Sequence, residues 1–194
     1  MDALILAGGE NKRLPVMKGF LRINRRRIIE FNIELLKGIF DRVIISTNNP
    51  EICFYLGVPM VGDIMKYRGP MTGILSVLIA TEASELFVIA CDMPFIEPEL
   101  IRYIVDKWAE RWDAVIPIFD KKPQPLLGIY SKRIAGIMEE SIKHGERSLR
   151  GFLKKIDVLY IGEEEVRAID PEGRSFVNIN TIEDYKRERL AISG

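Results

Sequence analysis

The amino-acid sequence predicts an α/β fold, a three-layer αβα sandwich around a mostly parallel sheet, with residues 1–194 forming a single domain. Short apolar runs alternate with segments of helical periodicity along the whole chain. Unbroken apolar runs are typical of strands that are buried on both faces, as in a parallel sheet covered by helices. A length of 194 residues suits one domain, and the apolar content of 47% and charged content of 29% are those of ordinary globular proteins.

The first strand is expected at 3–7, where an apolar run ends in Gly8-Gly9. Apolar residues at helical spacing predict a first long helix at 28–40 and a later one at 97–112. In chain order, the other expected elements are strand 42–46, helix 51–56, strand 59–61, helix 71–82, strand 86–90, strands 114–118 and 126–130, helices 132–143 and 148–155, and strands 158–161 and 176–180.

Composition excludes several classes of function. The 28 basic and 28 acidic residues balance, whereas nucleic-acid-binding domains usually carry a basic excess. No apolar run approaches the ~20 residues that span a bilayer, and the N-terminus does not resemble a signal peptide. Cys53 and Cys91 form no CxxC pair and His144 is the only histidine, which argues against zinc ribbons and secreted disulfide scaffolds. We therefore expect a cytoplasmic protein without nucleic-acid or membrane partners, working through carboxylates, lysines, backbone amides and a bound metal ion.

Two glycine-containing segments are candidates for ligand binding. Leu6-Ala7-Gly8-Gly9 follows the first strand, and its amides can approach a phosphate while Arg13 and Lys18 add positive charge. The loop matches neither GxGxxG nor the P-loop, so a plain strand-to-loop turn remains the alternative. Glycines flank a proline at 69–73, directly before an expected helix, and predict a helix N-terminus that faces the ligand.

Two aspartates follow expected strands. Asp92 comes directly after the apolar run 87–91, at a strand end where a carboxylate can hold Mg²⁺. The alternative is a cap for the next helix, which Pro94 and Pro98 make less attractive. Asp63 ends the segment 59–62 and is a candidate for ligand binding, or else a loop aspartate that bonds its own backbone.

Polar residues in the second half of the chain are further candidates for ligand binding. Gln124 is the only glutamine and lies between two prolines, in an extended segment. Asn178 and Asn180 would point to the same side of the strand expected at 176–180, with closure of a sheet edge as the alternative. Arg147 can meet an anionic ligand or remain a solvated arginine at a helix start.

These motifs carry a family resemblance. Leu6-Ala7-Gly8-Gly9 with Arg13 and Lys18 resembles the signature LAGGxxxRMGxxK of nucleotidyltransferases, with Leu14-Pro15 and Met17 as departures. Four further motifs follow in the family's order: Asp63 with Arg68-Gly69-Pro70-Met71-Thr72-Gly73, Asp92-Met93-Pro94, Gln124-Pro125-Leu126, and Asn178-Ile179-Asn180-Thr181. Within that group the chain is most similar to the molybdenum cofactor guanylyltransferases.

The resemblance implies a Rossmann-like nucleotidyltransferase sheet and Mg²⁺-dependent transfer of GMP from GTP to a molybdopterin-type cofactor, with release of pyrophosphate. It implies that the catalytic residues are Arg13, Lys18 and Asp92, with Asp92 as the metal ligand. The implied binding residues are Leu6, Ala7, Gly8, Gly9, Lys18, Asp63, Asp92, Gln124 and Asn180. Neither Ser46 nor Asn48 is assigned a role.

Three alternatives remain open at this point. A CTP-dependent cytidylyltransferase would act on the same pterin, and a sugar-phosphate nucleotidyltransferase would share the glycine loop. An inactive homologue would bind nucleotide or a partner without turnover, which the departures at Leu14-Pro15 and Met17 keep open. Transient contact with cofactor-inserting proteins or recipient molybdoenzymes is also expected.

Overall fold

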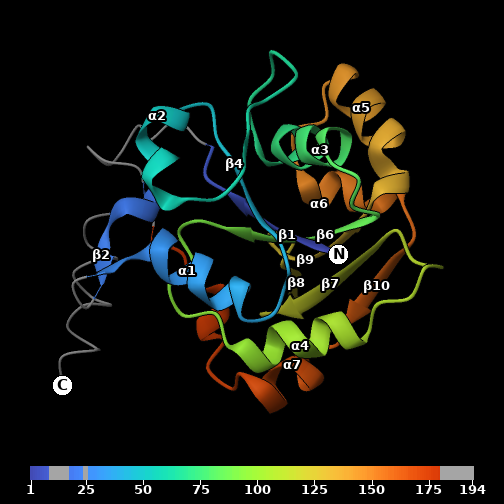
Figure 1. Ribbon diagram of the computed structural model, residues 1–194. Coiled ribbons are helices and arrows are strands. Elements are labelled where there is room, and N and C mark those ends of the chain that lie inside the picture. Colours follow the sequence, from blue (N-terminus) through green and yellow to red (C-terminus); the bar gives the residue numbers. More distant parts are fainter. Residues whose placement is uncertain (9–17, 24–25, 180–194) are drawn as a thin grey trace.

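In the computed structural model, which describes residues 1–8, 18–23 and 26–179, an eight-stranded sheet crosses the centre of the molecule (Figure 1). Its strand order is β10-β7-β9-β6-β1-β4-β5, and β8 pairs with β7. The strands are β1 (Asp2–Leu6), β4 (Val43–Ser46), β5 (Met60–Val61), β6 (Glu85–Ala90), β7 (Ala114–Phe119), β8 (Lys122–Pro123), β9 (Leu127–Ser131) and β10 (Val158–Ile161). A separate antiparallel pair is formed by β2 (Arg22–Ile23) and β3 (Arg26–Arg27).

The sheet is mixed but mostly parallel, as predicted. β1 pairs in parallel with β4 and β6, β4 with β5, and β7 with β10. β9 is antiparallel to both β6 and β7. The cause is the short connection at 120–126, because a parallel crossover needs about a dozen residues or more. The chain can therefore only return alongside β7 as a hairpin.

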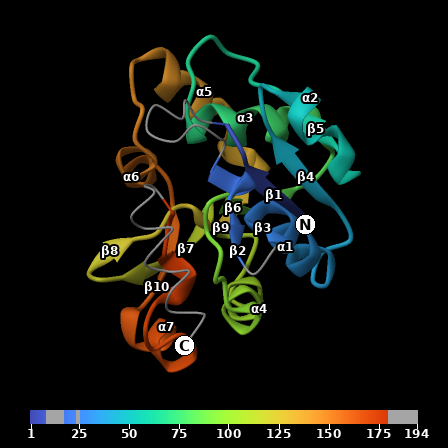
Figure 2. The same cartoon turned by 90° about the vertical axis from the view of Figure 1, so that its left-hand side faces the viewer.

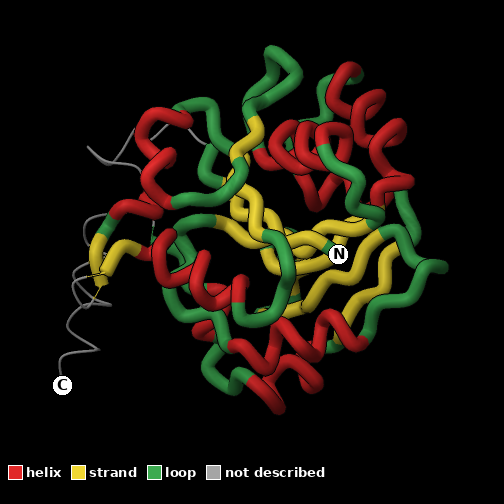
Figure 3. The backbone as a smooth tube through the Cα atoms, in the orientation of Figure 1, coloured by secondary structure: helices red, strands yellow, loops and turns green. Residues whose placement is uncertain are grey.

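Helices cover both faces of the sheet, which gives three layers (Figures 2 and 3). One layer contains α1 (Ile28–Lys37), α4 (Pro98–Asp106) and α7 (Glu163–Ile169), and the other contains α3 (Pro70–Ala80), α5 (Ala135–Lys143) and α6 (Leu149–Phe152). Two apolar cores result, one on each side of the sheet. A short helix, α2 (Pro50–Cys53), follows β4. Within the described residues, no helix is long and apolar enough to cross a membrane.

The structure corrects three sequence expectations. The helix expected at 97–112 ends at Asp106, after its buried residues Leu100, Ile101 and Ile104, and Trp108 then packs on the core from outside the helix. The strand expected at 176–180 is wrong for its described part: Arg174–Phe176 is a 3₁₀ turn, and residues 177–179 form no strand.

The third correction is α7, which the sequence analysis missed. Three glutamates occupy the first turn of this helix, and Val166 is its only fully buried residue among those described. A segment with a single buried position shows no apolar period. The other expected strands and helices are present within a few residues of their predicted bounds.

Candidate functional site

The carboxyl ends of three central strands lie side by side. In the parallel register, Leu6 at the end of β1 is opposite Ser46 of β4 and Ala90 of β6. The residues that follow these strands, among them Gly8 and Asp92, therefore gather at one edge of the sheet. Ligands of open α/β sheets bind at this edge, so the strand ends define the candidate site.

A small cavity of about 30 Å³ lies at this edge. Three of the predicted binding residues, Leu6, Gly8 and Asp63, line it together. Ala7, also predicted, is buried between Leu6 and Gly8. The other lining residues are Ser46, Asn48, Asn49, Arg68, Gly69, Pro70 and Gly73. The structure thus brings together the first glycine segment, the Asp63 segment and the start of α3.

Asp63 is held by a side chain from the neighbouring strand end. The Asn48 Nδ2 donates to Asp63 Oδ2 at 2.7 Å, and the Asp63 backbone N–H donates to Asn48 Oδ1 at 2.8 Å. Both ends of the Asn48 amide are used, so the Asp63 carboxylate has a fixed position. The sequence analysis left Asn48 without a role. The signal was its position two residues after β4, but only the structure shows that its partner is Asp63.

The N-terminus of α3 opens onto the small cavity. Its cap residue Gly69, at φ 146°, contributes no side chain, and Pro70 occupies the first turn. A Cβ at Gly73 would lie 2.8 Å from both Leu6 Cδ2 and Ser46 Oγ, so glycine lets the helix pack closely on β1 and β4. The positive end of an eleven-residue helix is thereby directed at the site, where it favours an anion.

Asp92 follows β6, as predicted, and does not cap α4, whose N-cap is Glu97. Its backbone carbonyl accepts the N–H of Ile179 at 3.0 Å, which ties the segment 177–179 to the end of β6. The carboxylate is an oxygen donor of the kind that Mg²⁺ prefers. Among the described residues, no three His, Cys, Asp or Glu side chains cluster as a metal site. One carboxylate can hold Mg²⁺ together with substrate phosphates, which is the usual arrangement for this ion.

A larger cavity of about 340 Å³ adjoins the first, because Pro70 lines both. Three residues singled out in the sequence, Gln124, Arg147 and Asn178, line it. The further lining residues are Met93, Pro125, Leu126, Leu127, Ser148, Leu149, Arg150 and Phe176. Two arginines make the wall basic, so the cavity suits an anionic molecule with an apolar body.

The polar side chains of this larger cavity are held by backbone groups. Gln124 Nε2 donates to the carbonyl of Phe119 at 3.1 Å, and Asn178 Nδ2 donates to the carbonyl of Phe176 at 3.2 Å. Arg150 Nε donates to the carbonyl of Pro123 at 3.1 Å. The sequence analysis missed Arg150, because nothing in the pattern places it beside Gln124.

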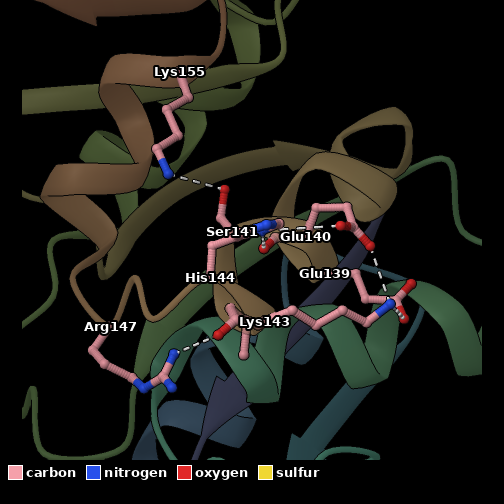
Figure 4. Close-up of polar contacts among 8 residues, drawn as sticks. Glu139, Glu140, Ser141, Lys143, His144, Arg147 and Lys155 are labelled. Atoms are coloured by element: carbon pink, nitrogen blue, oxygen red, sulfur yellow. Dashed lines mark hydrogen bonds and ion pairs between the residues drawn. The ribbon is translucent and has the colours of Figure 1, made fainter.

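Several predicted residues lie outside the described part of the chain. Gly9, Arg13 and Asn180 are among them, as is the side chain of Lys18. The expectation that Asn178 and Asn180 share one face of a strand is wrong for the described residues, since 177–179 is not a strand. His144 is exposed, and its Nδ1 lies 2.8 Å from the carbonyl of Glu140, one turn back along the chain (Figure 4).

Comparison with known proteins agrees with this geometry. The family model described as the MobA-like NTP transferase domain matches residues 3–159. The chain is 36% identical to a probable molybdenum cofactor guanylyltransferase of Peptoclostridium acidaminophilum, over 96% of this chain and 87% of that protein. It is 35% identical to a protein of the same name from Pelotomaculum thermopropionicum, over 96% and 91%.

A solved structure shows the same fold. The molybdopterin-guanine dinucleotide biosynthesis protein A of Archaeoglobus fulgidus superimposes with a TM-score of 0.84. The two chains are 28% identical, and the match covers 100% of this chain and 99% of the other.

Proposed function

The chain belongs to the family of MobA-like NTP transferases, and we propose that it transfers GMP from GTP to a molybdopterin-type cofactor, releasing pyrophosphate. The observation that carries the proposal is the pair of adjoining cavities at the start of α3. One cavity is lined by three of the predicted nucleotide residues, Leu6, Gly8 and Asp63, and the other is basic and large enough for a second substrate. A transferase needs both substrates in contact, and Pro70 is common to the two walls.

On the nucleotide side, we propose that Leu6, Ala7, Gly8 and Gly9 contact GTP through their backbone. Asp63, fixed by Asn48, accepts hydrogen bonds from the nucleoside. The N-terminus of α3 faces the same cavity and favours the negative charge of the nucleotide. Arg13 and Lys18 are proposed to offset the charge of the triphosphate.

The reaction requires one bond to form and one to break. An oxygen of the acceptor's terminal phosphate attacks the α-phosphorus of GTP, and the bond from that phosphorus to the bridging oxygen of the β-phosphate breaks. An ionised phosphate is already a nucleophile, so no base is needed, and catalysis rests on alignment and charge. Asp92 is proposed to hold Mg²⁺, which would offset the charge that develops on the phosphate oxygens.

On the acceptor side, the larger cavity supplies donors suited to an anion. Arg147 and Arg150 provide positive charge, while Gln124 offers an amide oxygen, its Nε2 being bonded to Phe119. Apolar residues from Pro125 to Leu127 line the same space. We propose that the phosphate of the acceptor contacts the arginines and that its ring system packs on the apolar wall. Asn180 is proposed to contribute from the segment that follows Ile179.

The decisive experiment measures pyrophosphate release from GTP, CTP and ATP, with and without the acceptor and Mg²⁺. Release is expected with GTP only when acceptor and Mg²⁺ are both present. Asp92→Ala should abolish it, whereas Asp106→Ala, which removes an exposed carboxylate at the end of α4, should not change it. Near-normal turnover by Asp92→Ala would overturn the metal assignment.

Nucleotide binding without turnover distinguishes the alternatives. At a GTP concentration of about 100 times Kd, thermal unfolding should shift by the equivalent of about 2.7 kcal/mol. A larger shift with CTP would favour cytidylyl transfer. Binding of nucleotide without pyrophosphate release would favour an inactive homologue.

The setting of the reaction is also part of the proposal. Within the described residues, neither Cys53 nor Cys91 forms a disulfide bond, as expected in the cytoplasm, where we place the reaction. Burial raises the pKa of the Cys53 thiol, which keeps it protonated and unreactive. We further propose that the product passes to cofactor-inserting proteins or directly to recipient molybdoenzymes.

A further inference from the structure

One aromatic side chain connects the nucleotide side of the site with the acceptor side. Tyr67 belongs to the segment between β5 and α3, which also carries Asp63 and Arg68 of the small cavity. Its ring lies under the guanidinium of Arg147, with Cζ 4.2 Å from the ring centroid. Arg147 in turn lines the larger cavity. Residues 80 positions apart in the chain thus meet at the boundary between the two substrates.

Two backbone carbonyls also hold the guanidinium of Arg147 through hydrogen bonds. Nη1 donates to the carbonyl of Ile142, in the last turn of α5, at 2.7 Å and to the carbonyl of Glu146 at 2.8 Å. The Arg147 backbone is fixed as well, because its N–H donates to the Glu146 carboxylate at 2.9 Å. Towards the described residues, the hydrogen bonds of the guanidinium itself thus engage Nη1, and none involves Nη2 or Nε. Nη2 and Nε form one edge of the guanidinium, and two such neighbouring donors can bind a phosphate with two parallel hydrogen bonds.

We propose that Tyr67 is a positioning residue for the acceptor, since its ring holds the Arg147 guanidinium in the plane from which Arg147 binds the acceptor's phosphate. This inference rests on the proposed function. A guanidinium on an exposed side chain otherwise samples many rotamers, and ordering it on binding weakens affinity. Stacking on a ring restricts the guanidinium before the acceptor arrives. The tyrosine ring, 47% exposed, is not needed by the core.

The expected effect on acceptor affinity follows from the contact between the Arg147 guanidinium and the Tyr67 ring. A cation over an aromatic ring at an exposed site contributes enough to change a dissociation constant about two- to fivefold. Loss of the Arg147 charge itself should weaken acceptor binding by on the order of tenfold, because charge-assisted hydrogen bonds are lost. GTP binding should not change, since Asp63 is held by Asn48 and not by Tyr67.

A double-mutant cycle tests the inference. The variants are Tyr67→Ala, Arg147→Ala and the double variant, with Tyr67→Phe to keep the ring and Tyr160→Ala to remove another exposed tyrosine, on β10. Acceptor affinity is measured by equilibrium filtration without GTP, and KM for each substrate is measured in the transfer assay. Tyr67→Ala should raise the Kd and KM of the acceptor about two- to fivefold and leave the KM of GTP unchanged. Tyr67→Phe and Tyr160→Ala should behave as the unaltered protein.

The double-mutant cycle shows whether Tyr67 acts by positioning Arg147 or by contacting the acceptor directly. In the Arg147→Ala background, removal of the Tyr67 ring should have no further effect, because the group that it positions is gone. An equal effect in both backgrounds, or an effect on GTP alone, would overturn the inference. If the unaltered protein binds the acceptor but releases no pyrophosphate, the proposed transfer fails while the binding cycle still decides the role of Tyr67. Absence of acceptor binding by the unaltered protein would overturn the inference itself.

Discussion

Gly73→Ala is expected to destabilise the fold and weaken GTP binding, because α3 has no room for a methyl group at this position. The added Cβ would lie 2.8 Å from Leu6 Cδ2 and 2.8 Å from Ser46 Oγ, well inside normal contact distance. Leu6 and Ser46 are 8% and 2% exposed, so neither side chain can rotate into solvent. Either Leu6 and Ser46 or the helix must shift. Leu6, Ser46 and the start of the helix all line the small cavity.

Two opposing contributions determine how much Gly73→Ala changes the free energy of unfolding. Helix propensity alone favours alanine over glycine by about 0.8–1 kcal/mol. Overpacking of a well-packed interior costs about 1–3 kcal/mol. The overlap is with two buried atoms, so we expect it to dominate. The net loss should be about 1 kcal/mol, or a fall in Tm of about 2–4 °C for a chain of this length.

The matched control is Gly136→Ala in α5. Gly136 is also a helical glycine, but a Cβ there would meet nothing within 4 Å. Only the propensity contribution remains, and the variant should gain about 0.5–1 kcal/mol. Urea unfolding of both variants measures the difference, and calorimetric titration with GTP should show weaker binding for Gly73→Ala alone. Equal stabilisation by the two substitutions would refute the argument that close packing requires glycine at 73.

Three further predictions concern single contacts. Asn32, fully buried in α1, has an amide that forms no hydrogen bond with the described residues. Asn32→Val should raise the free energy of unfolding by about 1–2 kcal/mol, because a buried unsatisfied amide is costly, and a loss in urea unfolding would contradict this. Hydrogen bonds from Tyr103 and Lys107 lower the pKa of Glu165 to about 2. The stabilisation by this carboxylate is therefore present above the ordinary pKa of 4.5 and lost as the pH falls towards 2. Glu165→Gln should cost about 0.2–1 kcal/mol at pH 7 and nothing near pH 2, and a cost independent of pH in thermal unfolding would argue against it. Asn48→Ala should raise the Kd of GTP about tenfold by releasing the Asp63 carboxylate, whereas unchanged affinity in calorimetric titration would show that Asp63 needs no support.

The sequence predicted the central strands and their ligand-facing ends because both depend on local pattern. Apolar runs such as 86–90 are unbroken in a strand that is covered on both sides, and β6 spans Glu85–Ala90. Asp92 and Gly8 could be placed at the same edge because the ends of parallel strands coincide. The sequence did not predict α7, whose single fully buried residue gives no period. The helix predicted at 97–112 was too long, because α4 ends at Asp106.

Contacts between distant segments could not be predicted. Asn48 and Asp63 are both polar residues after strands, and nothing in either segment indicates that they bond each other. The stacking of Arg147 on Tyr67 depends on how the loop before α3 meets the end of α5. Phe176 was expected in a strand, but its ring stacks on Phe119 with centroids 4.9 Å apart, and that contact holds the segment in another conformation. Side-chain partners of this kind are set by the packing of the whole fold.

The small cavity lies at the ends of core elements of the fold, whereas the larger cavity takes its polar side chains from loops and exposed positions. A shared fold therefore indicates the ligand of the small cavity more directly than the ligand of the larger one. The small cavity is lined by ends of β1 and β4 and by the start of α3, where a change such as Gly73→Ala disturbs the core. The larger cavity takes Gln124 from a hairpin loop, Arg147 from the segment before α6 and Arg150 from α6, and both arginines are exposed, so their substitution leaves the core intact. Acceptor specificity can therefore change at little cost in stability, whereas the nucleotide side is tied to the fold. The shared fold thus points to nucleotide chemistry, and the acceptor must be inferred from individual residues of the larger cavity. Substitution of Gln124, Arg147 and Arg150 should accordingly alter the KM of the acceptor while the KM of GTP and the Tm stay constant.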